Sequence, residues 1–458
     1  MVLTNKANKS KAVLSPAQKK ALAAKDPDRK IKQMIWVYFF LLIFEGALRK
    51  WILPFLSGPL LIVRDPIALY IIILAQQRGL IKSKYVKWTA TIGFISLLTA
   101  MVMGHGNFAV AIYGARILII HFPLIFIIGT VFNANDVIKM GKVTLIIAIP
   151  MIVLVALQFY SPQSALVNRG VGGNEEGAGF SGALGFFRPP GTFSFTNGNS
   201  LFFSFVAPFV FYFWLYPKHI NKLLLVGATI ALLGSIPTSI SRALFLSISV
   251  TAAFTVIGAI RKPAFLKSII GAGIGICILL IGLSQTSVFN KATEAFTARF
   301  EGANESEGGV QSVVLDRYFG GLLGAIGNSG SQPFFGYGIG LGTNVGSSLI
   351  SGGPILPEGE WGRVIGEQGA ILGLAYIMIR LLFSFDMLKR SYGRLAYGDL
   401  LPWIMLSILL LNVPQAQWKQ PTSLGFSILI GGLTMASLNQ PKKAKLLRKA
   451  PPIAILQT

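Results

Sequence analysis

The sequence predicts an all-α polytopic membrane protein of about twelve transmembrane helices with two long extracytoplasmic loops. Of its 458 residues, 53% are hydrophobic and only 13% are charged. Mean hydropathy is +0.64, whereas a soluble chain of this length needs a larger charged fraction to cover its surface. The apolar residues also form long blocks, and about 20 mostly apolar residues suffice to cross the ~30 Å hydrocarbon core of a bilayer.

Twelve apolar blocks meet or approach the length of a membrane span, and the connectors between them are basic or rich in glycine. The expected spans are residues 34–52, 59–77, 88–104, 108–129, 143–160, 199–216, 222–239, 243–260, 268–284, 361–384, 400–414 and 422–438. Together they form one transmembrane domain over residues 34–440. A basic N-terminal tail, 1–33, and a basic C-terminal tail, 441–458, flank this domain.

Lysine and arginine occur in every second connector, and this pattern orients the spans. With the N-terminal tail inside, the same side receives the C-terminal tail and the connectors near 78–87, 139–142, 218–222, 261–267 and 389–394. Cytoplasmic loops carry an excess of Lys and Arg, so both termini are expected in the cytoplasm. The net charge of +24 then reflects topology rather than nucleic-acid binding. The basic tails are interpreted as topogenic, with contact to anionic lipid as the alternative.

The two long segments on the opposite side are residues 161–198 and about 285–360. Both are rich in Gly and Ser, and the second contains amphipathic stretches from Val288 to Phe300 and from Val310 to Ile326. Such stretches predict short helices lying over the outer membrane face. The single cysteine, Cys277, excludes an intramolecular disulfide.

Charged side chains at membrane depth are costly, so each one is a functional candidate. The candidates in the outer halves of spans or at the outer boundary are Glu45, Arg49, Lys50, Arg64, Asp65, Arg116, Arg188, Arg242, Arg363 and Glu367. Two of these sets have a structural interpretation. Adjacent Arg64 and Asp65 can pair with other helices and hold them together, and Arg49 with Lys50 can serve as snorkelling anchors.

Arg188 and Arg242 stand out by their surroundings. Arg188 opens RPPGTFSFTN, in which two prolines and a glycine predict an irregular turn before a span, and Arg242 lies in TSISRALF between two spans. Guanidinium groups stay charged and bind phosphate oxygens in a bidentate manner, so two outer arginines suit a diphosphate. The histidines are scattered and no metal-binding motif occurs in the sequence, so no catalytic metal is expected.

Four segments, in order, resemble the O-antigen ligase and O-antigen polymerase superfamily. RPPGTFSFTN (188–197) is similar to its R-x-x-G-T-F-x-x-x-N segment, and SRALFL (241–246) to its S-R-[GA] segment. DRYFGGLLGAIGNSGSQPFFGYGIGLG (316–342) is similar to its arginine-led amphipathic helix followed by P-x-x-G-x-G-x-G. GEQGAILGL (366–374) resembles its E-x-G-x-x-G-L opening of a span.

The resemblance implies an inverting, metal-independent glycosyltransferase without a cofactor, in the inner membrane of a bacterium. The donor would be a glycan on a polyprenyl diphosphate, used on the outer face. The acceptor would be a lipid core for a ligase or another lipid-linked glycan for a polymerase. Membrane lipids and other polysaccharide-assembly membrane proteins are the further expected partners. By matched position, Arg188 and Arg242 would hold the diphosphate, with Arg317 as a third candidate. The further site candidates are Arg116, Asn197, Arg363 and Glu367.

One departure from the family pattern concerns the general base. Related enzymes have a His-Asn pair about nine residues before the E-x-G glutamate, and counting back from Glu367 reaches PEGEW instead. Glu358 or Glu360 therefore takes the place of the histidine, and a carboxylate can accept a proton from a sugar hydroxyl. The alternative is that both are solvated loop acids.

A rival function from another class is a transporter, such as a flippase of lipid-linked oligosaccharide. Twelve spans with intramembrane charges suit a transporter, but the charged candidates gather in the outer half of the membrane. A third alternative is a member of the superfamily that has lost activity. Clustering on one face favours chemistry on that face.

Overall fold

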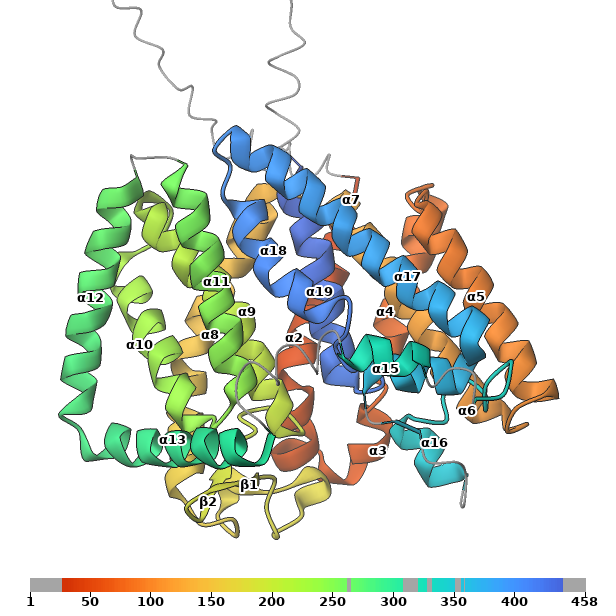
Figure 1. Ribbon diagram of the computed structural model, residues 1–458, viewed down its shortest axis with the longest axis horizontal. Helices are drawn as coiled ribbons and strands as arrows, with labels where there is room; N and C mark the ends of the chain where they lie inside the picture. The colour runs from red at the N-terminus through yellow and green to blue at the C-terminus, as the bar shows by residue number, and fades with distance from the viewer. Residues whose placement is uncertain are drawn as a thin grey trace, which may run out of the picture.

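The computed structural model describes residues 27–261, 265–307, 320–327, 332–350, 356–357 and 359–439. These residues form a bundle of α-helices with one small antiparallel hairpin (Figure 1). Eight of the described helices are long and apolar enough to cross a membrane, or up to nine when a bent pair counts as one span. The all-α polytopic fold is thus observed, whereas the expected twelve spans are not all confirmed.

Each expected span nevertheless coincides with a helix or a pair of consecutive helices. In the first half these are α2 (Arg29–Ala47), α4 (Arg64–Gln77), α5 (Lys84–Val102), α6 (Phe108–Arg116) with α7 (Phe122–Val131), α8 (Ala134–Tyr160) and α9 (Thr196–Leu215). In the second half they are α10 (Lys222–Thr238), α11 (Arg242–Ile260), α12 (Leu266–Ser284), α17 (Glu360–Ala396), α18 (Leu401–Asn412) and α19 (Pro421–Ser437). The difference from twelve arises partly because α18, with 12 residues, is only ~18 Å long at 1.5 Å per residue.

Shorter elements connect these helices. They are the π-helical turns η1 (Leu48–Ile52) and η3 (Ile117–His121), the 3-10 turns η2 (Pro54–Leu56), η4 (Leu166–Asn168), η5 (Val171–Gly173) and η6 (Pro217–His219), and the helices α3 (Ser57–Leu60), α13 (Ser287–Glu307), α15 (Gly321–Gly327) and α16 (Asn344–Leu349). The strands are β1 (Phe180–Ala183) and β2 (Phe186–Arg188), which pair antiparallel with Phe180 opposite Arg188.

The basic connectors meet at one end of the bundle, here called the basic end. Lys32 forms an ion pair with Asp136 at 3.2 Å, and the hydroxyl of Tyr216 donates to the carbonyl of Gly398 at 3.3 Å. At this same end the side chain of Arg78 donates to the carbonyl of Pro27. These contacts join the N-terminal tail to the connectors near 78–87 and 139–142, and the connector near 218–222 to the end of α17, as the alternation of charge predicts.

The long connectors lie at the opposite end, here called the loop end. It carries the β1–β2 hairpin, which the sequence did not predict, and helix α13 (Figure 1). A bend of 101° separates α13 from α12, so α13 crosses the end of the bundle instead of continuing the span. The amphipathic stretch expected from Val288 to Phe300 falls within α13. Of the second expected stretch, only the part in α15 belongs to the described residues.

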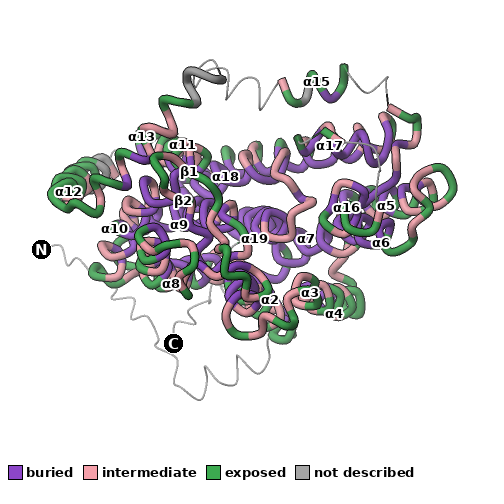
Figure 2. Tube along the Cα trace, turned by 90° about the horizontal axis from the view of Figure 1, so that it is seen from below, coloured by how far each residue is buried: buried purple, intermediate pink, exposed green. Residues whose placement is uncertain are grey.

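The core of the bundle forms around α7, α9, α18 and α19, where burial is most continuous (Figure 2). Close helix approach depends on small residues there. A Cβ atom added to Gly432 of α19 would lie 2.7 Å from the Cβ of Ile128 in α7. Membrane helices use such small residues to bring their backbones together, and the peripheral helices α4, α5 and α12 expose their outer faces (Figure 2).

Candidate functional site

A small apolar cluster at the loop end brings three arginine-bearing elements together. Ile240, Ala292 and Ala295 are buried with Phe159, and Phe186 packs against them. The rings of Phe159 and Phe186 stack with their centroids 4.6 Å apart. Phe186 lies on β2, Ile240 lies two residues before α11, and Ala295 lies on α13. This cluster therefore fixes the relative position of a strand and two helices.

Arg188, Arg242 and Arg299 project from these same three elements, and we call them the arginine cluster. Arg188 ends β2, Arg242 is the first residue of α11, and Arg299 lies one turn beyond Ala295 on α13. Burial, together with the positive charges of Arg299 and Arg242, lowers the pKa of Arg188. The cluster therefore contains the two arginines that the sequence selected and a third that it did not.

Within the cluster, Arg188 and Arg299 lack acidic partners among the described residues. The Nε atom of Arg188 is buried and has no hydrogen-bond partner. Among the described residues, no carboxylate forms an ion pair with Arg188 or Arg299. Buried guanidinium groups normally find such partners, so the arrangement suits an anion supplied from outside the chain.

The turn that follows Arg188 is held from both sides. Gly191 has a φ of +62°, which favours glycine, and its N–H donates to Oε1 of Gln158 at 2.7 Å. Its carbonyl accepts from Nζ of Lys50 at 2.7 Å. Lys50 is 1% exposed, so it acts as a clamp on this turn and not as the snorkelling anchor that was one interpretation of the sequence.

A cavity of about 320 Å³ lies beside Arg242, between α9, α11 and α18. We call it the α9–α11–α18 cavity. Its polar lining residues are Asn197, Ser200, Ser204, Arg242, Ser247, Asn412 and Gln415, and its apolar ones include Leu201, Leu246 and Val250. The amide of Asn197 donates to Oε1 of Gln420 at 3.2 Å and to Oγ of Ser423 at 3.0 Å. A largely apolar cavity thus lies next to Arg242 of the arginine cluster.

Glu360, Arg363, Glu367 and Arg380 form a second, charge-balanced network within α17. Oε1 of Glu360 accepts from Nη1 of Arg380 at 2.7 Å and from Nη2 of Arg363 at 3.0 Å. Oε2 of Glu367 accepts from Nη1 of Arg363 at 2.6 Å. All four side chains are buried. The structure therefore brings Glu360 to Arg363 and Arg380, whereas the sequence proposed it as a base for the acceptor hydroxyl.

The segment between α18 and α19 separates this network from the α9–α11–α18 cavity. Arg380 donates through Nε to the carbonyl of Val413 at 2.7 Å, and Trp361 donates through Nε1 to the carbonyl of Pro414 at 2.9 Å. Asn412 and Gln415 of the same segment line the cavity. The network thus supports one wall of the cavity.

Two of the glycine-rich motifs meet at a break in α17. Gly369 interrupts the helix with a φ of 75°, which frees carbonyl groups of the preceding turn. The N–H groups of Tyr337 and Gly338 donate to the carbonyls of Gly366 and Glu367 at 2.8 and 3.0 Å. The N–H of Gly342 donates to Oε1 of Glu367 at 2.8 Å. The loop after Pro333 is therefore inserted against the broken helix.

Arg116 belongs to a different buried network. Its Nη1 bonds to Asp65, and the other carboxylate oxygen of Asp65 lies 2.9 Å from Nε2 of His121. Nη2 of Arg64 donates to the carbonyl of Pro421 at 2.7 Å. These contacts join α4 to η3 and to the start of α19, so the structural interpretation of Arg64 and Asp65 is confirmed.

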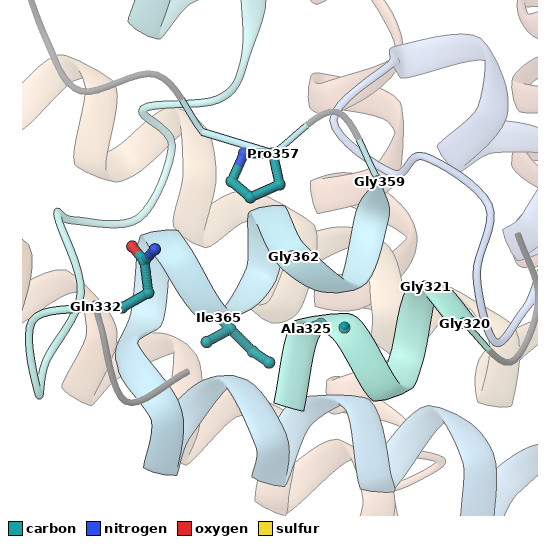
Figure 3. A pocket seen from close by; sticks show the side chains of 9 residues that line it. Gly320, Gly321, Ala325, Gln332, Pro357, Gly359, Gly362 and Ile365 are labelled. Carbon is teal, nitrogen blue, oxygen red and sulfur yellow. The ribbon is translucent and has the colours of Figure 1, made fainter. Parts of the chain in front are cut away.

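A cavity of about 220 Å³ lies between α15 and the first turns of α17 (Figure 3). Gln332, Pro357, Gly359, Gly362 and Ile365 are among its lining residues (Figure 3). The amide oxygen of Gln332 is buried there without a hydrogen-bond partner. Glu358, the other proposed base, and Arg317, the third proposed diphosphate ligand, lie outside the described residues.

Two site residues escaped sequence reasoning for different reasons. Arg299 lies in a stretch that the sequence described only as amphipathic, and the contact of α13 with the segments around β2 and α11 reveals it. Arg380 carried a usable signal, because it is an arginine inside an expected span. In the structure, Arg380 forms an ion pair with Glu360.

Within the described residues, no group of three or more His, Cys, Asp or Glu side chains is arranged to hold a metal ion. No family model, curated protein or solved structure matches this chain.

Proposed function

We propose that the chain is a membrane glycosyltransferase that transfers or polymerises a glycan from a polyprenyl-diphosphate carrier on the outer face of the bacterial inner membrane. The observation that carries the proposal is the arginine cluster, in which the charges of Arg242 and Arg299 act on Arg188 and Arg242 lines a largely apolar cavity. A lipid diphosphate has a matching division into a polyanionic head and an apolar chain.

In the reaction, a hydroxyl oxygen of the acceptor attacks the anomeric carbon of the donor glycan as the bond to the diphosphate oxygen breaks. The diphosphate leaves with the bonding electron pair, and the configuration at the anomeric carbon inverts. Fixed positive charge at the leaving group lowers the barrier because it stabilises the charge that develops there. Arg188, Arg242 and Arg299 would supply that charge, and the α9–α11–α18 cavity would receive the first isoprene units.

The acceptor proton needs a base, and the contacts of Glu360 argue against it in that role. Its carboxylate accepts three hydrogen bonds from two guanidinium groups. These contacts occupy both carboxylate oxygens, so neither is placed to take up the proton of an acceptor hydroxyl. Glu358, two residues earlier, is the remaining candidate from the sequence.

The test is a proteoliposome assay with a lipid-linked glycan donor, in which transfer and translocation are measured separately. Arg188→Ala and Arg242→Ala should each lower the transfer rate ~100-fold, because a charge-assisted contact to the leaving group is lost. Arg188→Lys should fall between them and the parent, since lysine keeps the charge but not the bidentate geometry.

Arg169→Ala is the matched control, because Arg169 lies on the same connector and pairs with exposed Glu175 at 2.9 Å. Its transfer rate should equal that of the parent. Parental transfer in the Arg188→Ala, Arg242→Ala double variant would refute the diphosphate site. Translocation of the donor without its consumption would establish the flippase instead.

A further inference from the structure

The largest of the three described cavities lies at the basic end, away from the proposed glycan site. It measures about 720 Å³ and lies between the end of α4, the start of α5, α7 and the second half of α17. We call it the basic-end cavity. Five cationic residues line it, against a single acid: Arg78, Lys82, Lys84, Lys389 and Arg390, with Asp386.

The single acid leaves most of this charge unneutralised. Asp386 accepts a hydrogen bond from the hydroxyl of Tyr85. Of the lining cations, Arg78 has an acidic partner, Asp28 at 3.5 Å. Within the described ranges, no ion pair joins an acid to Lys82, Lys84 or Lys389. The cavity therefore holds an excess of positive charge. Membrane topology explains why lysine and arginine lie at this end, but it does not require them to line one cavity.

The lining also has an apolar side. Phe126, Phe383, Met387 and Met435 line the cavity below the cations. On the adjacent outer surface of α5 and α17, Trp88 is 43% and Phe385 61% exposed. The ammonium group of Lys84 lies 5.3 Å from the ring centroid of Trp88. Tryptophan and lysine in this combination are typical of the level at which phospholipid headgroups lie.

We propose that the basic-end cavity binds the phosphate headgroup of an anionic membrane phospholipid, with its acyl chains against the apolar surface of α5 and α17. The excess positive charge favours an anionic ligand, and the apolar lining favours an anion attached to hydrocarbon chains. Cationic pockets between membrane helices at a basic face bind such headgroups. The site is independent of the proposed transferase activity, since none of its lining residues belongs to the arginine cluster or the charge-balanced network.

The test uses the full chain in nanodiscs of phosphatidylcholine containing phosphatidylglycerol, with native mass spectrometry of the lipid retained after detergent extraction. The parent should retain phosphatidylglycerol in preference to phosphatidylcholine. Each lysine is expected to contribute about fivefold to affinity, so Lys82→Gln, Lys84→Gln, Lys389→Gln should bind at least tenfold more weakly.

Two matched variants make the result specific. The first is a triple variant that removes the same charge from exposed positions at the same end: Lys87→Gln, Lys218→Gln, Lys222→Gln. None of these residues lines the cavity, so this variant should retain the lipid. The second is a triple variant that keeps the charge of the lining lysines: Lys82→Arg, Lys84→Arg, Lys389→Arg. It should also retain the lipid, and this result would distinguish loss of binding from loss of folding in the glutamine variant.

If the two glutamine variants retain equal amounts of phosphatidylglycerol, the proposal is overturned, because nonspecific electrostatic attraction would then explain the lipid binding. Displacement of the lipid by millimolar inorganic phosphate would also overturn it, since the site would then recognise a soluble phosphate. Retention of a polyprenyl diphosphate in place of the phospholipid would reassign the cavity to the path of a transporter.

Discussion

The arginine cluster and the charge-balanced network place the same residue type near the loop end, yet they neutralise its charge differently. In the network, Arg363 and Arg380 share the carboxylates of Glu360 and Glu367, and all four side chains are buried. In the cluster, Arg188 faces two further arginines, and its Nε has no partner. The network neutralises its own charges, whereas Arg188 of the cluster is left with a buried Nε that could receive the proposed anion.

The two regions also depend on different forces for their geometry. The cluster is positioned by a small apolar cluster that joins β2, α11 and α13. The network positions itself through its own ion pairs and through hydrogen bonds to the carbonyls of Val413 and Ala416. Removing a charge should therefore affect activity in the cluster and stability in the network.

The largest expected effect is that of Glu360→Ala on stability. Without this carboxylate, Arg380 keeps backbone carbonyls and the rings of Trp418 and Tyr376 as partners but loses its acidic partner. A buried charge without a counterion costs about 3–5 kcal/mol. The measurement is the unfolding midpoint in detergent. Glu175→Ala, which removes an exposed acid, should leave the midpoint unchanged. A Glu360→Ala protein that is as stable as the parent but inactive would restore Glu360 as the base.

The next effect concerns the break in α17 that carries the network. Alanine at Gly369 would adopt a φ of +75° and place its Cβ 2.0 Å from the carbonyl oxygen of Phe334. Strain and overpacking together should cost about 2–4 kcal/mol of unfolding free energy. Gly393 lies in the same helix with open space around it. Gly393→Ala should instead stabilise by about 0.5–1 kcal/mol, and equal effects at both positions would contradict the proposed packing.

A smaller effect, of opposite sign in stability, is expected from Arg299→Ala. The variant removes a positive charge that repels Arg188, so the free energy of unfolding should stay equal or rise by about 0.5 kcal/mol or less. The glycan transfer rate should fall about tenfold or more, because one contact to the diphosphate is lost. A fall in stability with parental transfer would show that Arg299 is structural.

The smallest expected effect comes from single cysteine substitutions, which test on which side of the membrane the loop end and the basic end lie. In a Cys277→Ser background, cysteine at exposed Ser181 should react with an impermeant maleimide on intact cells. Cysteine at exposed His219, at the basic end, should react only after lysis. The reverse pattern would place the arginine cluster in the cytoplasm and exclude the proposed outer-face reaction.

Much of the fold was predictable because hydrophobic length is a local property. Every expected span coincides with a helix, and the alternation of basic connectors matches their common position at one end. The hairpin around Arg188 was missed because Phe180–Ala183 and Phe186–Arg188 are too short for a strand pattern to stand out. The count of spans differs because length decides spanning, and α10, α18 and α19 are short, with 17, 12 and 17 residues.

The site divides in the same way. Charge at membrane depth and the turn after Arg188 were enough to select Arg188 and Arg242 from the sequence. Arg299 and the partners of Glu360 depend on contacts between segments far apart in the chain, such as β2 with α13 and Arg380 with the carbonyl of Val413. Local sequence determined which segments enter the membrane, because burial in hydrocarbon is decided residue by residue. Only the tertiary structure decided which arginines are neutralised, because a charge is neutralised by its neighbours in space.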